Sequence, residues 1–287
     1  MYKQVLALSV YPAGPTLQPT NHPMVTCPTC GEYLSNLRYA DDIVLLSHSF
    51  NELHGMLDEL VREGRKVGLK VNVTKTKLMA NRPTGTVQID RREVEKVESF
   101  IYLGSVVSTM RCDGQELRRR IRAGWFSFHR YSDFFRDRRI RMDQKRKLYN
   151  MCVLPAMLYG SETWALTKKM EMDLAVAQRR MERMMVGVTV LDRRTNEWLR
   201  GVTKAEDVVR EYRQRKWKYA VKVADMGSER WVKKVTEWWP RSGQRKVGRP
   251  RRRWRDEVTR FAGVNWMTTV RSNQSDVIRE AFIRNEL

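Results

Sequence analysis

Acidic residues are scarce at the start of this chain, and that scarcity limits any carboxylate site further along. The first forty residues contain one acidic residue, Glu32, whereas residues 1–30 contain five prolines. Prolines at this density interrupt regular helices and strands. We therefore expect residues 1–30 to be an unstructured or foreign segment, and we expect no upstream carboxylate to complete a site that needs one.

Long apolar runs and abundant cysteines are also missing. No segment approaches the ~20 apolar residues of a membrane-spanning helix, and the run Val5–Val10 is shorter than the ~7–15 residues of a signal-peptide core. The four cysteines do not make a disulfide framework, and Cys27-x-x-Cys30 lacks the second pair of ligands of a zinc site. The sequence predicts a reduced intracellular protein, nuclear or cytoplasmic, that is neither secreted nor membrane-bound.

Positive charge, in contrast, is plentiful. The 287 residues include 55 Lys and Arg against 33 Asp and Glu, so the formal net charge is +22. Such an excess indicates a polyanionic partner, and nucleic acid is the first candidate. The length suffices for one large or two ordinary domains with a buried core.

The most informative segment is Tyr39-Ala40-Asp41-Asp42, which lies inside the apolar run Leu37–Leu46. Two adjacent carboxylates in an apolar β-type segment are costly to desolvate, and a metal ion or cationic ligand offsets that cost. Apolar residues on both sides predict two short strands with the acidic pair at the turn between them. The alternative is that the pair only forms an Asx-type turn.

The chain changes character near Cys112. Before it, strand patterns at 33–37, 43–46, 69–73 and 100–107 surround a helical pattern from Leu53 to Val61, which predicts an α/β or α+β half-domain over residues 31–110. After it, helices are expected near 117–125, 143–159, 170–186 and 205–226. The first of these carries a basic face that includes Arg118, Arg119, Arg120 and Arg122. Any one such face is a solvated surface by default, but several of one sign in succession indicate a nucleic-acid groove.

A strongly basic segment follows at residues 240–255. Seven of the eleven residues from Arg245 to Arg255 are basic: Arg245, Lys246, Arg249, Arg251, Arg252, Arg253 and Arg255. A Gly-Arg-Pro core such as Gly248-Arg249-Pro250 can lie in an AT-rich minor groove. Because Val247 stands where such hooks have Arg, a basic linker that contacts phosphates without sequence preference fits the segment better.

These motifs, in this order, resemble the reverse transcriptase of a non-LTR (LINE-type) retrotransposon, from about residue 31 to residue 275. Leu37–Leu45 resembles the palm motif that carries the catalytic aspartates, and Gly68–Thr76 resembles the next palm motif with its Asn-x-x-Lys-Thr. Tyr102-Leu103-Gly104 is similar to the primer-grip hairpin, and Leu154–Trp164 to the helical thumb. The segment Gly248–Trp254 is similar to the C-terminal region of these element proteins.

The resemblance implies an α+β fold: a partial right-hand polymerase palm, with a small antiparallel sheet plus a helix, then a mainly helical thumb and a basic C-terminal region. The expected boundaries are 1–30, 31–110, 111–170 (thumb), 171–239 (helical region) and 240–287 (basic tail). It implies an RNA template, a DNA primer or target DNA, dNTPs and two Mg²⁺ ions.

The resemblance also implies roles for individual residues. Asp41 and Asp42 match the catalytic metal ligands, and Lys75 matches the residue that places a proton near the leaving group. The expected substrate and primer contacts are Tyr39, Asn72, Tyr102, Leu103 and Gly104. The expected nucleic-acid contacts are Arg118, Arg119, Arg122, Arg245, Lys246, Arg249, Arg251, Arg252 and Arg253.

One part of the family pattern is not matched. The family's metal site needs a further Asp from an earlier palm strand, and its fingers precede that strand, whereas nothing before Tyr39 in this sequence supplies either. The expected function is therefore an RNA-directed DNA polymerase fragment that is inactive alone. The alternatives are a non-catalytic basic nucleic-acid-binding protein derived from a retroelement, or a pseudogene product with no role.

Overall fold

The computed structural model describes residues 2–9, 34–47, 49–80, 85–108, 114–237, 252–272 and 275–285, with residues 2–9 described by their backbone alone. The chain divides into two compact units. Unit 1 comprises Met1–Cys112 and Glu237–Val247, and unit 2 comprises Asp113–Thr236 and Gly248–Leu287.

Unit 1 is built on a six-stranded sheet with the order β2-β3-β1-β5-β8, with β4 beside β1. Its strands are β1 (Tyr2–Ser9), β2 (Asn36–Tyr39), β3 (Asp42–Ser47), β4 (Lys70–Val71), β5 (Lys77–Ala80) and β8 (Glu95–Lys96). Only β2 and β3 pair antiparallel, and the other pairs are parallel. The unit is α+β in composition, but the expectation of an antiparallel sheet was wrong.

The strand β1 accounts for this difference. It lies at the centre of the sheet, where it pairs with β3 on one side and with β4 and β5 on the other. The proline-rich composition suggested an unstructured segment, but the prolines begin at Pro12, after β1 has ended. Since β3 is an apolar strand whose backbone groups need partners, an apolar run such as Val5–Leu8 suits the place beside it. Residues 10–30 lie outside the described residues.

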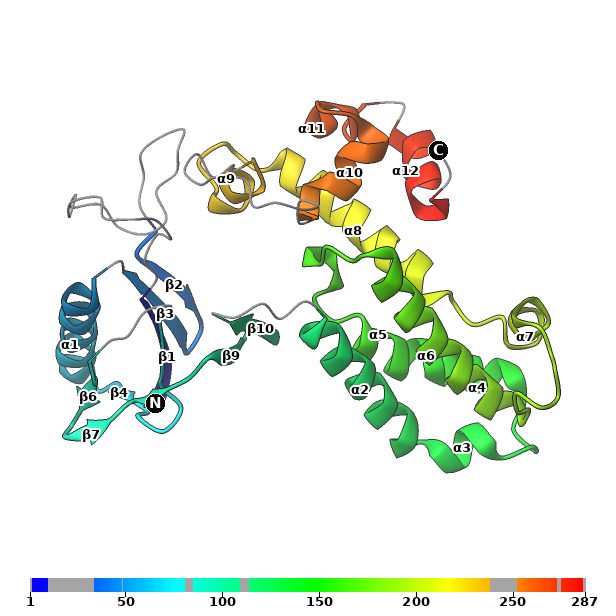
Figure 1. The fold of residues 1–287 in the computed structure, drawn as a ribbon, viewed down its shortest axis with the longest axis horizontal. Helices are drawn as coiled ribbons and strands as arrows, with labels where there is room; N and C mark the ends of the chain where they lie inside the picture. The colour runs from blue at the N-terminus through cyan, green and yellow to red at the C-terminus, as the bar shows by residue number, and fades with distance from the viewer. Residues whose placement is uncertain are drawn as a thin grey trace, which may run out of the picture. The chain divides into compact units, whose positions relative to one another are not determined.

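Each face of the sheet is covered by a different element (Figure 1). Helix α1 (Phe50–Lys66) packs on one face, where it forms a core with alternate residues of β3 such as Ile43 and Leu45. On the other face, Val44 and Leu46 contact Phe100 and Tyr102. Successive side chains of a strand point to opposite faces, so β3 is buried on both sides.

Two hairpins complete unit 1. Strands β9 (Ser99–Tyr102) and β10 (Ser105–Ser108) form one, and β6 (Gln88–Ile89) and β7 (Arg92–Glu93) form the other. The turn Leu103-Gly104 has positive φ at both residues, 47° and 78°, as in the two-residue type I′ turns that match the twist of a hairpin. The expected strand at 100–107 is thus a hairpin that reverses at its glycine.

Unit 2 is helical. Its described helices are α2 (Gln115–Arg130), α3 (Ser132–Arg136), α4 (Met142–Leu148), the π-helix η1 (Tyr149–Val153), α5 (Leu154–Met157), the 3₁₀ turn η2 (Ser161–Thr163), α6 (Lys168–Val186), α7 (Asn196–Thr203), α8 (Val208–Asp225), α9 (Trp231–Glu237), α10 (Trp254–Ala262), α11 (Trp266–Thr269) and α12 (Ser275–Arg284). The helices expected near 117–125, 170–186 and 205–226 are confirmed as α2, α6 and α8. None of the described helices is long and apolar enough to cross a membrane.

The helix expected from Asp143 to Tyr159 is also present, but its bend takes the form of a π-helical turn. The π-helix η1 lies directly before Pro155, at the junction of α4 and α5. Proline has no N–H to donate to the carbonyl four residues earlier, and its ring crowds that carbonyl. Widening the preceding turn relieves both problems, which explains why the π-helix lies here.

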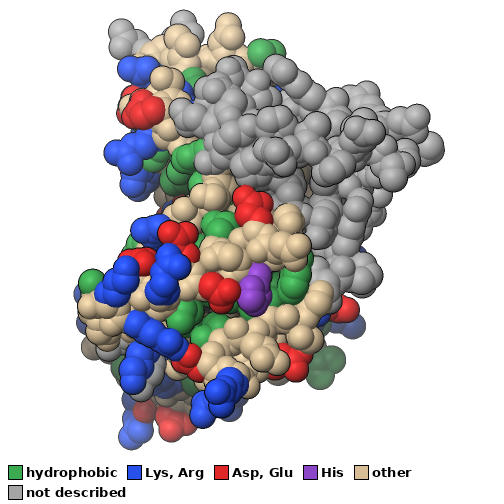
Figure 2. Space-filling view, turned by 90° about the vertical axis from the view of Figure 1, so that its left-hand side faces the viewer, with side chains coloured by type: hydrophobic (Ala, Val, Ile, Leu, Met, Phe, Trp, Pro, Cys, Tyr) green, Lys and Arg blue, Asp and Glu red, His purple; other side chains and the backbone are tan. Residues whose placement is uncertain are grey.

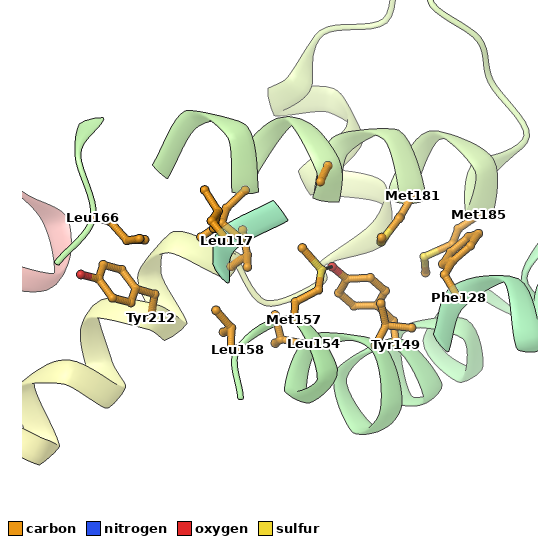
Figure 3. Close-up of a cluster of buried hydrophobic side chains, with 14 of the residues drawn as sticks. Leu117, Phe128, Tyr149, Leu154, Met157, Leu158, Leu166, Met181, Met185 and Tyr212 are labelled. Atoms are coloured by element: carbon orange, nitrogen blue, oxygen red, sulfur yellow. Dashed lines mark hydrogen bonds between the residues drawn. The ribbon is translucent and has the colours of Figure 1, made fainter. Parts of the chain in front are cut away.

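Two hydrophobic clusters hold unit 2 together. In the first, α2, α5 and α6 enclose Phe128, Tyr149, Met157 and Met181 (Figure 3). In the second, residues of α8 such as Trp217 contact residues of α10–α12 such as Phe282. The described part of the segment expected as a basic tail, 252–285, is therefore folded onto α8 and belongs to the same compact unit.

Candidate functional site

The acidic pair lies at the tip of the hairpin formed by β2 and β3, as predicted. Tyr39 pairs with Asp42 across the two strands, so Ala40 and Asp41 form the two-residue connection. Ala40 has a φ of 48°, a left-handed conformation that glycine adopts more easily than alanine. A residue with a side chain in this region costs about 1–3 kcal/mol, and such outliers cluster at functional sites.

Asp42 lies on the face of the sheet that the β9–β10 hairpin covers. Its side chain shares a face with Val44 and Leu46, because residues two apart in a strand point the same way, and these two contact Tyr102. Burial raises the pKa of Tyr102, and the nearby Asp42 carboxylate raises it further. Tyr39, which is paired directly opposite Asp42, is 64 % exposed.

A second predicted motif, Asn72–Thr76, lies at the same end of the sheet. Gln4 of β1 pairs with Asp42, whereas its neighbour Lys3 pairs with Val71 on the other side. Only β1 separates the two motifs, and strands lie about 4.8 Å apart. The fold thus places the acidic turn and the loop after Val71 on either side of one strand, although about 30 residues separate them in the sequence.

Within that loop, Asn72 holds the backbone. Its side-chain oxygen accepts hydrogen bonds from the Lys75 N–H at 3.1 Å and the Thr74 hydroxyl at 2.7 Å. Its carbonyl accepts one from the hydroxyl of buried Thr76 at 2.8 Å. The Asn side chain therefore forms an Asx turn, and Lys75 is left with an exposed side chain. Asn72 acts here as the residue that shapes the loop.

The carboxylates suit one magnesium ion better than two. Mg²⁺ usually binds through one or two carboxylates together with water and substrate phosphates. The half-exposed side chains of Asp41 and Asp42 can supply the two carboxylates. Among the residues that the structure describes, no group of three or more Asp, Glu, His or Cys side chains gathers to hold a metal. The described residues therefore do not fit a site for a pair of metal ions.

Some arginines on the basic face of α2 form ion pairs within the helix, and others are exposed to solvent. Arg119 and Arg120 both bind Glu116, at 2.9 and 2.6 Å, and Arg120 also lies over the Tyr159 ring. Burial would raise the pKa of Glu116, but hydrogen bonds from these two arginines outweigh burial and lower it. Arg120, expected on the basic face, is buried. Arg118 and Arg122 are exposed and can reach a phosphate.

The basic C-terminal segment divides in a similar way. Arg245, Lys246, Arg249 and Arg251 lie outside the described residues. Arg252 donates to the Leu166 carbonyl at 2.7 Å and lies 3.5 Å from the Glu257 carboxylate. Arg252 thus has internal partners in unit 2, and its expected contact with nucleic acid stays a prediction.

Neighbours of Arg252 anchor the same segment. The Trp254 indole donates to the Glu162 carbonyl at 2.6 Å, and the Arg253 N–H donates to Asp256 at 2.6 Å, at the start of α10. Arg253 is half-buried. Arg252 and Trp254 therefore fasten α10 to the segment that follows α5, whereas the Arg253 bond lies within the start of α10.

Sequence analysis did not identify the buried charges beneath this anchor. Lys216 of α8 is fully buried, where it donates to the Glu257 carboxylate and, at 2.8 Å, to the Trp164 carbonyl. The Tyr212 hydroxyl also donates to Glu257, at 2.8 Å. Burial lowers the pKa of Lys216, and Glu257 partly opposes that shift. The signal that could have revealed this was the spacing of four between Val208, Tyr212, Lys216 and Ala220 on the apolar face of α8.

The positive charge of the chain is not spread over every surface. Figure 2 shows the side of unit 1 on which α1 lies, where Lys and Arg side chains alternate with Asp and Glu. Helix α1 itself carries Glu52, Asp58, Glu59 and Glu63 against Arg62, Arg65 and Lys66. This face offers no uniform attraction for a polyanion, whereas α2 has five arginines and one glutamate.

The proximity of Tyr102 and Asp42 predicts a measurable coupling. In Asp42→Asn the pKa of Tyr102 should fall, because a nearby negative charge disfavours the tyrosinate, yet burial should keep it above that of free tyrosine. NMR of ¹³C-labelled tyrosine, with Tyr102→Phe to assign the signal, measures this. The matched control Asp41→Asn should shift the pKa less, and equal shifts would contradict the placement of Asp42 on the face that the β9–β10 hairpin covers.

The contacts of Arg252 predict a role in stability. Arg252→Ala should lower the free energy of unfolding by about 1–3 kcal/mol, because the buried Glu257 loses a cation and the Leu166 carbonyl loses its donor. The control Arg284→Ala removes an exposed pair with Glu280 and should change stability by less than about 0.5 kcal/mol. Urea denaturation compares the two. Unchanged stability together with weaker nucleic-acid binding would instead support the role expected from the sequence.

Comparisons with known proteins agree with the motifs. The reverse transcriptase (RNA-dependent DNA polymerase) family matches residues 16–107, which include the acidic turn, the Asn72 loop and the β9–β10 hairpin. The match begins before the start near Gly31 that the resemblance indicated. A transposon-derived protein of Caenorhabditis elegans is 34 % identical over 246 residues, which cover 79 % of this chain and 85 % of that protein.

No solved structure matches the chain. The identity and coverage of the nematode protein nevertheless establish the relationship, and the family match locates the reverse transcriptase motifs in unit 1. The chain belongs to the family of transposon-derived proteins, and its residues 16–107 match the reverse transcriptase (RNA-dependent DNA polymerase) family.

Proposed function

We propose that the chain comes from a retrotransposon of the non-LTR (LINE) type, and that it binds a template–primer duplex without extending the primer by itself. It is an RNA-directed DNA polymerase by descent.

The observation that carries the proposal is the grouping of three motifs in unit 1. The acidic turn and the Asn72–Thr76 loop flank one strand, and the β9–β10 hairpin covers the face that holds Asp42. A polymerase site needs carboxylates for metal, a cation near the leaving group and a surface for the primer. We assign the metal-binding carboxylates to Asp41 and Asp42, and the cation to Lys75. The surface for the primer is assigned to the hairpin turn Tyr102-Leu103-Gly104.

The exposed side chains support this assignment. Tyr39, paired directly opposite Asp42, is exposed, and so is Leu103, which follows Tyr102 in the chain. Exposed aromatic and apolar side chains provide surfaces on which a nucleotide or sugar can rest. When bound, Mg²⁺ supplies charge neutralisation for the triphosphate and activation of the primer hydroxyl. The residues of this chain contribute the two carboxylates that would hold it and the exposed amine of Lys75.

The absence of activity is proposed from the number of carboxylates. The sequence before Tyr39 offers Glu32 alone, and β1, the neighbour of β3, contains no Asp or Glu. A pair of metal ions held by two adjacent carboxylates is under-neutralised. The loss of an essential member of such a set usually lowers the rate by several orders of magnitude.

The test is primer extension by the purified chain on poly-rA/oligo-dT with Mg²⁺ and dTTP. We expect no extension above background, even when the protein saturates the duplex as measured by fluorescence anisotropy. The matched variant Asp41→Ala should behave identically. Extension that Asp41→Ala abolishes would overturn the proposed inactivity and make this chain a polymerase in its own right.

A second function, nucleic-acid binding without catalysis, is favoured by a separate observation. Unit 2 presents Arg118 and Arg122 on the exposed face of α2, whereas Arg119 and Arg120 are engaged with Glu116. Binding by exposed arginines releases counterions, is steeply dependent on salt and needs no Mg²⁺. It would persist in a protein whose acidic pair is vestigial.

The exposed arginines give a prediction of their own. The double variant Arg118→Ala/Arg122→Ala should weaken binding to any duplex, and it should reduce the slope of log K against log salt by about 0.9 for each phosphate that the protein no longer neutralises. Anisotropy titrations at several salt concentrations measure both. The control Arg62→Ala removes a comparably exposed arginine from α1, where charges of both signs alternate, and should leave the slope unchanged. Equal slopes for all three proteins would exclude α2 as the surface that meets the duplex.

A further inference from the structure

The loop between α6 and α7 in unit 2 exposes two large apolar side chains. Val190 is 79 % exposed and Leu191 is 90 % exposed, and both lie in the segment Val188–Thr195. Burying an exposed valine or leucine is worth about 1.5–3 kcal/mol, and the protein does not obtain that stabilisation in the folded chain alone. A single exposed apolar residue is ordinary, so the significance of this pair depends on whether the loop holds it in a fixed position.

The loop is held in a defined shape. The Asp192 carboxylate accepts hydrogen bonds from the Thr189 N–H at 2.6 Å and the Thr189 hydroxyl at 2.9 Å, while the Arg193 N–H donates to the Val190 carbonyl. The bond from the Thr189 N–H is the main reason why the pKa of Asp192 is lowered, so this carboxylate is ionised at neutral pH. Val190 and Leu191 are therefore presented at the tip of a closed turn.

The residues that follow the turn are anchored to the neighbouring helices α6 and α7. Arg183 of α6 donates to the Arg194 carbonyl at 3.2 Å and to the Asn196 side chain at 3.0 Å. The Thr195 hydroxyl caps α7 by accepting from the Trp198 N–H. Such bonds limit the freedom of the loop, so its tip loses less entropy on binding than a mobile segment would lose.

Cations flank the apolar tip. Arg193 and Arg194 follow the turn directly and are exposed, and the Arg194 guanidinium lies 5.1 Å from the centre of the Trp198 ring. Arg138, from the segment between α3 and α4, lies beside Gly187 at the start of the loop. A duplex can use both kinds of side chain at once, because the arginines can contact its phosphates and the apolar side chains can contact its base steps. The one acidic side chain of the turn, Asp192, is engaged by the N–H and hydroxyl of Thr189.

A double-stranded nucleic acid fits this surface better than a lipid layer or an apolar protein groove. Architectural proteins insert Leu, Ile or Met between base steps of the minor groove while neighbouring basic residues contact the phosphates. Two apolar residues bury too little area for a stable protein interface, which needs about 800 Å² for each partner. The chain has a net charge of +22, which attracts a duplex to the surface from a distance.

We propose that the Thr189–Asp192 turn is a wedge that inserts Leu191, with Val190 beside it, into the minor groove of a bound duplex and unstacks a base step there. Arg193 and Arg194 hold the flanking phosphates. The inference rests on the proposed nucleic-acid binding and adds a site on unit 2 that lies outside the residues matched by the reverse transcriptase family.

The experiment uses the full chain with two probes, a DNA duplex and an RNA–DNA hybrid, each with 2-aminopurine in the DNA strand. Unstacking of the probe base raises its fluorescence, and anisotropy of an end label gives the affinity. We expect the unaltered chain to raise the fluorescence of at least one probe. The double variant Val190→Ser/Leu191→Ser should lose that rise and bind about tenfold more weakly, which corresponds to about 1.4 kcal/mol.

The matched control is Val264→Ser, which changes a residue that is 92 % exposed elsewhere in unit 2 and should retain both the rise and the affinity. Thermal melting should show equal stability for all three proteins, because the substitutions touch exposed side chains. A duplex bound with the same affinity and fluorescence by the double variant would overturn the wedge and leave the proposed function standing. No duplex binding by the unaltered chain at low salt would overturn both. A double variant that changed only self-association or vesicle binding would show a protein or lipid surface instead.

Discussion

Burial of β3 on both faces is the constraint on which the arrangement of unit 1 depends. Ile43 and Leu45 face α1, while Val44 and Leu46 face the β9–β10 hairpin. Because both faces of the strand are covered, charged side chains can reach water at its exposed end. Asp41 and Asp42 occupy that end, so their carboxylates keep access to water while the strand behind them is rigidly held.

In unit 2 the corresponding constraint is a buried charge. Lys216 lies among apolar residues of α8 and binds Glu257 of α10 and the Trp164 carbonyl. A buried lysine without such partners would be strongly destabilising, so the C-terminal helices must stay docked on α8 for the unit to be stable. Arg252 and Trp254 add bonds from the same segment. Part of the basic C-terminal sequence therefore stabilises the fold. A large net charge alone does not identify which arginines contact a binding partner.

The two units suggest a division of tasks in a transposon-derived protein. Unit 1 brings the acidic turn and the Asn72–Thr76 loop to one end of a sheet. Unit 2 carries the exposed arginines of α2 and the apolar turn between α6 and α7. The proposed binding without catalysis is physically consistent, because affinity for a duplex depends on many weak contacts, whereas catalysis depends on a few groups that act together.

The sequence by itself determined the acidic hairpin from Leu37 to Leu46 and the long helices of unit 2, because spacing and turn chemistry are properties of neighbouring residues. At 100–107 the pattern indicated one strand with a glycine break, where the structure has the β9–β10 hairpin. It also indicated the family through the order of its motifs. Only the tertiary structure decided that Tyr2–Ser9 is the central strand, that Asn72 and Asp42 flank it, and that Arg120, Arg252 and Lys216 are engaged inside the fold. Strand pairing and charge burial join residues that are distant in the chain, and no local pattern specifies such partners.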